Sequence, residues 1–313
     1  MKLLFILDPL NSLKNYKDTS LAIMREAANS GHMLYVCEQH DVIMRFDAIK
    51  TIVKRFEFNN TNIGYELGNA SEVVATVFDA ILMRKDPPFD NEYLYSTYLL
   101  EIAVNQGARV LNNPAAVRSW NEKLSVARFL QFAPNFLVTA NSDLIREFLA
   151  EHKDIIVKPL DGMGGTGIFR LTESDPNIGA ILETATQFGA QTIMAQRYLP
   201  AIKQGDKRII VINGEPLPYA LARIPKAGET RGNLAAGGTG VAQALTERDL
   251  EIATTVGKTL KAEGLFLVGL DVIGEHLTEI NVTSPTGMVE IAAQTPCNAA
   301  QVFVQALQDI CLK

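Results

Sequence analysis

The sequence predicts a mixed α/β and α+β fold, in which a parallel α/β unit is followed by two smaller α+β units. Three observations predict it: a strand–helix–strand pattern opens the chain, a glycine-rich run lies between two strands in the middle, and a hairpin over residues 265–282 carries acidic side chains. With 313 residues and a hydrophobic fraction of 47%, the chain is long enough for two or three structural modules.

The first unit is expected over residues 1–122. Lys2–Leu7 indicates a buried strand, Asp18 to Ser20 offer N-caps to a helix that ends at Gly31, and residues 33–37 indicate the next strand. Another strand, a helix closed by Gly107 and a further strand are expected at 80–83, 90–106 and 108–111. This order of elements is typical of a parallel sheet.

The other two units are expected over residues 123–200 and 201–313. In the second, strands at 136–139, 155–158, 168–171 and 192–198 alternate with helices at 142–152 and 178–188. In the third, Asn213-Gly214 predicts a hairpin turn between strands 208–212 and 217–223, and a helix over 247–263 precedes the acidic hairpin. Residues 225–240 are rich in glycine and poor in large apolar side chains, which predicts a mobile loop.

Composition limits the class of function. The longest apolar start, residues 3–7, is far shorter than the roughly 20 residues that cross a bilayer, so we expect no membrane segment and a cytoplasmic location. A net charge of −6 without a Lys/Arg run disfavours a nucleic-acid partner. The three cysteines, Cys37, Cys297 and Cys311, are widely separated and odd in number, which is typical of reduced thiols.

The glycine-rich run 161–167 matches the pattern GxGxxG of dinucleotide-binding proteins. That motif requires a helix to begin within the glycines, whereas residues 168–171 continue as a strand. We therefore expect a flexible flap whose backbone N–H groups close over phosphates, with Lys158 supplying a positive charge on the strand that leads in. The alternatives are a plain tight hairpin beside a surface lysine, or a dehydrogenase in which the dinucleotide motif is real.

The acidic hairpin carries Asp271 on one strand and Glu279 and Asn281 on the other. A three-residue turn over 274–276 would place Asp271 directly opposite Glu279, whereas a two-residue turn would put them on opposite faces. Facing carboxylates repel unless a cation lies between them, and hard oxygen donors suit Mg²⁺, with Mn²⁺ as an alternative. The competing interpretation is a solvated acidic edge of a sheet.

Five long segments resemble a known family. They are MRKDPPFD at 83–90, KPLDGMGG at 158–165, LARIP at 221–225, ETRGNLAAGG at 229–238 and LTEINVTSPT at 277–286. They are similar to segments of prokaryotic glutathione synthetases, and the resemblance runs over nearly the whole chain. It implies an ATP-grasp fold with an N-terminal α/β domain, a small lid domain and a C-terminal domain, and it places ATP between the last two.

The resemblance also implies roles for individual residues. Lys123 and Lys158 would hold the ATP phosphates, and Asp206 would bind the ribose. The other nucleotide-binding residues that it implies are Gly162, Met163, Gly164, Gly165 and Gly167 in the flap, and Gln196, Arg197, Tyr198 and Leu199 around the adenine. Asp271, Glu279 and Asn281 match the family's magnesium ligands. Arg208 would lie beside the transferred phosphoryl group, and Arg231 would close over an acyl phosphate.

The second substrate is expected at the carboxyl ends of the first unit's strands, where ligands collect in open α/β sheets. Candidate contacts are Asp18, Ser20, Arg84, Lys85 and Asp86, although Arg84 and Lys85 could equally be surface charges. Ser284 and Thr286 follow the acidic hairpin and are candidates for the amine substrate. Val289 departs from the Arg or Gln found there in many relatives, which puts a substrate-carboxylate role at this position in doubt.

The reaction that the resemblance implies is the ATP-dependent joining of γ-glutamylcysteine to glycine through an acyl phosphate, in a homotetramer. Other amide ligases of the same fold, which add glutamates to a protein tail or join D-alanines, would use the same chemistry. A nucleotide-binding regulatory protein would keep Lys158 and the flap, but it would not need three metal ligands.

Overall fold

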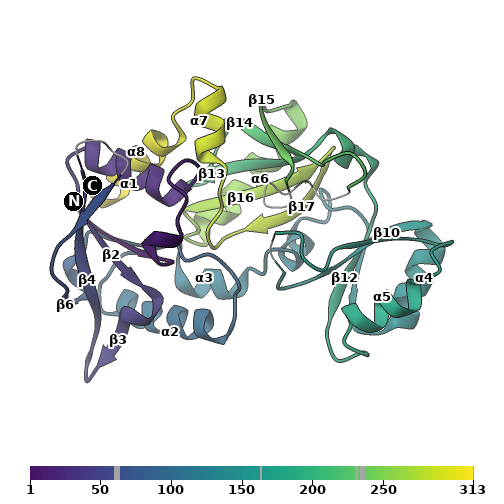
Figure 1. Ribbon diagram of the computed structural model, residues 1–313, viewed down its shortest axis with the longest axis horizontal. Coiled ribbons are helices and arrows are strands. Elements are labelled where there is room, and N and C mark those ends of the chain that lie inside the picture. Colours follow the sequence, from purple (N-terminus) through teal and green to yellow (C-terminus); the bar gives the residue numbers. More distant parts are fainter. Residues whose placement is uncertain (60–63, 163, 230–231, 233–236, 313) are drawn as a thin grey trace.

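The computed structural model describes residues 1–59, 64–162, 164–229, 232 and 237–312, and it contains three β-sheets (Figure 1). The N-terminal sheet has the strand order β3-β4-β2-β1-β7-β8, and β5 and β6 also pair with β4. Its elements are β1 (Lys2–Leu7), α1 (Thr19–Asn29), β2 (Met33–Glu38), β3 (Val42–Arg45), β4 (Ala48–Phe58), β5 (Tyr65–Leu67), β6 (Ser71–Val74), β7 (Ala80–Met83), α2 (Asn91–Asn105), β8 (Val110–Leu111) and α3 (Pro114–Ser119).

Alternation along β1 explains why this sheet is covered on both faces. Leu3, Phe5 and Leu7 pack in one core with α1 and α8 (Ala299–Cys311), whereas Leu4 and Ile6 pack in another core with α2. Figure 1 shows α1 and α8 above the sheet and α2 below it. Within the described residues, no helix is both long enough and apolar enough to span a membrane.

The expected parallel unit is confirmed for β1, β2, β7 and β8, which pair in parallel. The expectation missed β3 to β6, which extend the sheet with antiparallel pairings. These strands carry charged side chains and are half exposed, so they lack the continuous apolar runs that marked the parallel strands. The sheet is therefore mixed.

The lid sheet is a separate four-stranded antiparallel layer with the order β11-β10-β12-β9. Two helices cover one face, and eight buried residues such as Ile145, Val157 and Leu182 form a core of its own. Its elements are β9 (Phe136–Thr139), α4 (Ser142–His152), β10 (Asp154–Pro159), β11 (Phe169–Thr172), α5 (Ile178–Ala185) and β12 (Ile193–Arg197). Its opposite face, which includes Ile156, Lys158 and Gln196, is turned toward the rest of the molecule.

The C-terminal sheet has the order β15-β14-β13-β16-β17, and all its neighbouring strands are antiparallel. Its elements are β13 (Asp206–Ile212), β14 (Glu215–Ile224), β15 (Thr239–Ala244), α6 (Glu247–Ala262), β16 (Leu267–Ile273), β17 (His276–Asn281) and α7 (Met288–Gln294). The predicted mobile loop 225–240 runs into β15 at Thr239. Six of its residues, 230, 231 and 233–236, lie outside the described part of the chain, so its mobility stays a prediction.

Asn112 joins the N-terminal sheet to the C-terminal hairpin. Its side-chain Nδ2 donates to the carbonyl oxygens of Leu267 and Val282, at 2.8 and 2.6 Å. Its Oδ1 accepts from the backbone N–H groups of Phe266 and Leu267, at 2.7 and 2.8 Å. The residue is only 7% exposed, so one amide satisfies four backbone groups that are shielded from water.

Candidate active site

A cavity of about 620 Å³ lies where the three sheets meet. The C-terminal sheet supplies its floor, the glycine-rich run and the inner face of the lid sheet supply one wall, and the loops after β1 and β7 supply another. Each predicted domain range contains one of the three sheets, while the exact domain boundaries stay a prediction.

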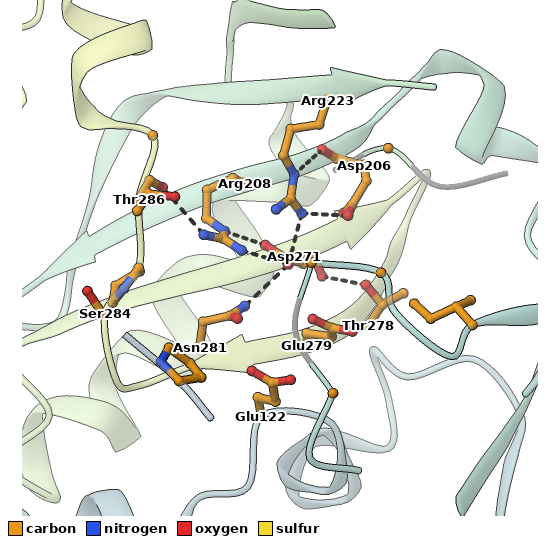
Figure 2. A pocket seen from close by; sticks show the side chains of 18 of the residues that line it. Glu122, Asp206, Arg208, Arg223, Asp271, Thr278, Glu279, Asn281, Ser284 and Thr286 are labelled. Carbon is orange, nitrogen blue, oxygen red and sulfur yellow. Dashed lines mark hydrogen bonds and ion pairs between the residues drawn. The ribbon is translucent and has the colours of Figure 1, made fainter. Parts of the chain in front are cut away.

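The charged floor follows from the alternation of side chains along the strands. Asp206 and Arg208 lie two apart on β13, Asp206 pairs with Arg223 on β14, and Arg208 pairs with Asp271 on β16. These side chains therefore share one face of the sheet, and Figure 2 shows them converging. Alternate residues of β13, such as Ile209 and Val211, turn to the opposite face and pack in a core with α6.

The acidic hairpin has the predicted pairing of Asp271 with Glu279, but its turn differs from the expected one. The three-residue turn was wrong, because Ile273 pairs with His276 and leaves only Gly274 and Glu275 in the turn. A β-bulge then makes Thr278 an extra residue, so that Val272 pairs with Leu277 while Asp271 pairs with Glu279. The predicted Asp271–Glu279 pairing is confirmed. The Thr278 hydroxyl donates to the Asp271 carbonyl oxygen at 3.1 Å.

Asp271 lies at the centre of a buried ion-pair network (Figure 2). Its Oδ1 accepts from Arg208 Nε at 2.5 Å, and its Oδ2 accepts from Arg208 Nη2 at 2.9 Å and lies 2.8 Å from Arg223 Nη2. Asn281 Nδ2 also donates to Oδ2, at 3.2 Å. Burial opposes ionisation of Asp271, but the two guanidinium groups outweigh it and lower the pKa of this carboxyl below its ordinary value.

Two further carboxylates of the cavity have raised pKa values although each contacts a cation. Asp206 pairs with Arg223 at 2.5 Å through Oδ2, while its buried Oδ1 has no hydrogen-bond partner. Burial, assisted by Asp271 and Glu279, raises the pKa of Asp206 to about 7. Burial and the charge of Glu279 likewise raise the pKa of Glu122 to about 7. Carboxylates are therefore crowded on this side of the cavity.

This crowding fits a cation. Asp271, Glu279 and Asn281 all line the cavity and offer hard oxygen donors of the kind that Mg²⁺ prefers. Over the residues that the structure describes, no three His, Cys, Asp or Glu side chains gather as a metal site, so the predicted set depends on the amide of Asn281. Because guanidinium groups engage both oxygens of Asp271, Glu279 is the more available carboxylate. The assignment of these three residues as metal ligands stays a prediction.

Two buried lysines face this negative charge. Lys123 Nζ donates to the Gly162 carbonyl oxygen at 2.7 Å, contacts the Glu122 carboxylate and lies 4.0 Å from Glu279 Oε1. Lys158 Nζ lies 3.6 Å from the same Glu279 oxygen. Burial lowers the pKa of Lys158, whereas Glu279 and Glu122 outweigh burial at Lys123 and raise its pKa. The pair concentrates positive charge beside the flap, as phosphate binding requires.

The flap has the predicted strand–loop–strand form. Strand β11 follows the glycines, so the helix that a dinucleotide motif needs is missing from this place, and the dehydrogenase interpretation is not supported. Gly164, Gly165 and Gly167 have φ values of 65, 81 and 73°, a region that favours glycine. Gly162, Gly164 and Gly165 line the cavity and Gly167 does not, while Met163 lies outside the described residues.

The other predicted residues divide between the cavity wall and its support. Gln196, Tyr198, Leu199, Asp18, Asp86, Ser284 and Thr286 line the cavity, whereas Arg197, Ser20, Arg84 and Lys85 do not. Arg84 instead donates to Ser20 Oγ and to the Pro285 carbonyl oxygen, both at 3.0 Å. Lys85 pairs with Asp8 at 2.7 Å. Arg231 lies outside the described residues.

Two models of protein families match the chain. The N-terminal domain of prokaryotic glutathione synthetase matches residues 1–118, and the ATP-grasp domain of prokaryotic glutathione synthetase matches residues 122–296. The chain belongs to the prokaryotic glutathione synthetase family.

Individual relatives agree with the family models. Glutathione synthetase from Nitrosomonas europaea is 58% identical over 312 residues, which cover 98% of each chain, and the one from Pseudomonas aeruginosa is 54% identical over 292 residues, 93% of this chain and 92% of the relative. Among solved structures, the D-cycloserine synthetase DcsG has a TM-score of 0.68 at 15% identity and covers 99% of each chain. D-alanyl-alanine synthetase A from Vibrio cholerae has a TM-score of 0.61 at 14% identity and covers 100% of this chain and 98% of its own. Both structures support the ATP-grasp fold.

Sequence reasoning missed Arg223 and Glu122. A regular hairpin about Asn213-Gly214 pairs Ile212 with Glu215 and would extend to Asp206 opposite Leu221, but a register shift between Ile209 and Val211 brings Arg223 there instead. No local sequence pattern predicts that register shift. Glu122 stands at the boundary between the two family domains, and only the fold brings it to Glu279, which belongs to the distant hairpin.

Proposed function

We propose that this member of the glutathione synthetase family joins γ-glutamylcysteine to glycine with ATP, giving glutathione, ADP and phosphate. One observation carries the proposal: Lys123 and Lys158 lie within 4.0 Å of Glu279, in the same cavity as Asp271 and Asn281, in a chain matched over nearly its whole length by two family domains. Phosphoryl transfer relies on positioning and charge neutralisation, and this inventory of side chains supplies both.

The proposed reaction has two steps. A carboxylate oxygen of the cysteinyl residue attacks the γ-phosphorus of ATP, and ADP leaves. The glycine amine then attacks the acyl carbon, phosphate leaves with the C–O bonding pair, and the amine loses its proton. The lysines counter the charge of the phosphates, and Arg208, 2.5 Å from Asp271, is fixed at the cavity floor for the transferred group. Neither step needs a nucleophile from the protein.

Bound Mg²⁺, with Mn²⁺ as a substitute, would neutralise phosphate charge, and Asp271, Glu279 and Asn281 are the residues that would hold it. For the ribose we propose Asp206, because its buried Oδ1 lacks a hydrogen-bond partner and can accept from a hydroxyl. For the peptide we propose Asp18 and Asp86, and for glycine Ser284 and Thr286, since all four line the cavity. Arg231 stays a proposal from the family pattern.

The substrate pair is tested by measuring phosphate release. We expect rapid release of phosphate with ATP, Mg²⁺, γ-glutamylcysteine and glycine, because phosphate leaves when the glycine amine attacks the acyl phosphate formed from ATP and the dipeptide. Parallel reactions would contain D-alanine alone, or glutamate with a peptide that ends in glutamate. Release with either rival mixture but not with the dipeptide and glycine would assign the chain to a different ligation.

The glycine-rich loop 225–240 is expected to keep water from the acyl phosphate. Replacing residues 227–237 by a short Gly-Ser linker should therefore uncouple the reaction, so that ATP is hydrolysed in excess of the peptide formed. The ratio of ADP to glutathione, measured by chromatography in the presence of all substrates, reports this. A ratio of one in the shortened variant would contradict the proposed role.

The family and the thiols also support a cytoplasmic location, because Cys37, Cys297 and Cys311 are all free and such thiols are kept reduced there. Burial raises the pKa of Cys37 strongly, so this thiol should be unreactive in the folded protein. The homotetramer that the resemblance implies stays a prediction.

A further inference from the structure

One end of the cavity is apolar. It is lined by side chains of the lid sheet and of the segment that leads from the lid to the C-terminal sheet, among them Ile156, Tyr198, Leu199 and Ile202. Tyr198 directly follows β12 and is only 9% exposed. A flat aromatic base is the part of ATP that suits such a lining, whereas the phosphates require the lysines.

A charged residue that does not line the cavity lies over the Tyr198 ring. Arg170 does not line the cavity, but its guanidinium carbon lies 3.8 Å from the centroid of the Tyr198 ring. At this distance the planar cation is stacked against the ring, an attraction that fixes both groups. The side chain of Arg170 is 37% exposed, so solvent moderates the strength of the contact.

Asp154 fixes Arg170 in turn. Arg170 Nε donates to Asp154 Oδ1 at 2.9 Å and Nη2 donates to Oδ2 at 2.6 Å, a two-pronged pair that holds the guanidinium plane. The backbone carbonyl of Asp154 also accepts from the Tyr198 N–H at 3.0 Å. Asp154 therefore binds the backbone of Tyr198 directly and its ring through Arg170.

The position of Arg170 in the chain connects Tyr198 to the strand that follows the flap. β11 begins two residues after Gly167, the last glycine of the flap, and Arg170 pairs there with Ile156 of β10, which itself lines the cavity. The stack thus links the strand that returns from the flap to the segment beside the apolar end. Nothing in the sequence pattern singled out this pair.

We propose that Arg170 is a positioning residue for nucleotide binding: it holds the Tyr198 ring in place as a wall for the nucleobase and ties that wall to the strand after the flap. The identity of the occupant as ATP rests on the proposed function. Arg170 acts on the base end only. Its removal should therefore weaken nucleotide binding and leave the chemical step and the other two substrates unaffected.

The test compares Arg170→Ala with the wild type by calorimetric titration of ADP and by steady-state kinetics. We expect the ADP dissociation constant and the KM for ATP to rise about tenfold, as loss of a stacked cation and of ring placement predicts. The kcat at saturating ATP and the KM values for γ-glutamylcysteine and glycine should stay within about twofold of the wild type. Asp154→Asn should change ADP binding in the same direction by less, because it weakens the pair without emptying the site.

Three control variants separate this role from general support of the fold. Glu173→Gln breaks the exposed Lys153–Glu173 pair, at 2.9 Å on the same sheet edge, and should leave ADP binding unchanged. In a Tyr198→Phe background, which keeps the ring, Arg170→Ala should still weaken ADP binding. In a Tyr198→Leu background, Arg170→Ala should have no further effect, because the partner of the stack is already missing.

Unchanged ADP affinity in Arg170→Ala would overturn the inference. An equal rise in the KM of all three substrates, or additive effects in the Tyr198→Leu background, would overturn it too. The outcome is independent of the proposed ligation. A wild type that binds ADP but releases no phosphate with the dipeptide and glycine would contradict the proposed function, while the ratio of ADP affinities would still decide the role of Arg170.

Discussion

Replacing Asp271 by alanine is expected to lower the free energy of unfolding by about 3–5 kcal/mol and to reduce kcat at least about a thousandfold. Asp271 is 2% exposed, and its carboxylate is the common partner of Arg208 and Arg223. Without it, two buried guanidinium groups lose a counter-charge that water cannot replace. The floor that holds Arg208 in the cavity also loses its order.

Urea unfolding and phosphate release measure the two effects. Glu251→Gln is the matched control, because it breaks an exposed pair with Arg248 and should cost no more than about 1 kcal/mol. Asp271→Asn keeps the shape but loses the charge, so it should be less damaging to stability and equally damaging to turnover. A stable Asp271→Ala protein with near-normal kcat would show that the ion-pair network around Asp271 contributes to neither stability nor turnover.

The contribution of Asp271 has a defined pH range. Its folded pKa lies below the ordinary value of about 4, so its stabilisation is complete above that pH and is lost only as the pH falls through the lower folded value. The difference in unfolding free energy between the wild type and Asp271→Ala should therefore be constant only above about pH 8, because Asp206, whose pKa Asp271 helps to raise to about 7, takes up a proton below that pH.

Asn112→Ala is expected to lower the free energy of unfolding by about 4 kcal/mol or more. The substitution removes four hydrogen bonds at once and leaves two N–H groups and two carbonyl oxygens buried without partners, each at a cost of about 1–3 kcal/mol that local adjustment partly relieves. Asn112→Asp should be at least as harmful, since it sets an acceptor against the carbonyl oxygens of Leu267 and Val282.

Asn141→Ala provides the comparison for Asn112. Asn141 is an exposed N-cap of α4 that bonds two backbone N–H groups, so its loss should cost only about 1 kcal/mol. Urea denaturation of the three variants gives the order. Equal stability of Asn112→Ala and Asn141→Ala would mean that water or a backbone shift replaces the lost bonds.

Local sequence patterns were sufficient to predict elements whose structure depends on the spacing of apolar residues or on a single residue type. The apolar run of β1, the Asp18 cap of α1 and the strand after the flap were all predicted from neighbours in sequence and are confirmed. The shared face of Asp271 and Glu279 was predicted by period two. It depended on a turn that turned out shorter than expected, and the bulge at Thr278 made up the difference.

What could not be predicted depends on contacts between distant segments. The pairing of Arg223 with Asp206 needs a register shift inside a hairpin, and the four bonds of Asn112 need strands more than 150 residues away. Arg84 and Lys85 looked like substrate contacts because of their place after β7. In the structure Arg84 contacts Ser20 and Pro285, and Lys85 contacts Asp8; no local pattern indicated these partners, and the substrate roles stay predictions.

The separate core of the lid sheet determines how the cavity can admit its contents. Residues of the N-terminal and C-terminal sheets, such as Ile6 and Val268, share one continuous core. Ile145, Val157 and Leu182 belong to a core that contains lid residues alone. Met194 of β12, however, belongs to the core of the other two sheets, so a rotation of the lid about its connections near Asn135 and Leu199 would break that contact. A hinge movement of the lid that admits the nucleotide would therefore keep the lid's own core intact but cost the burial of Met194.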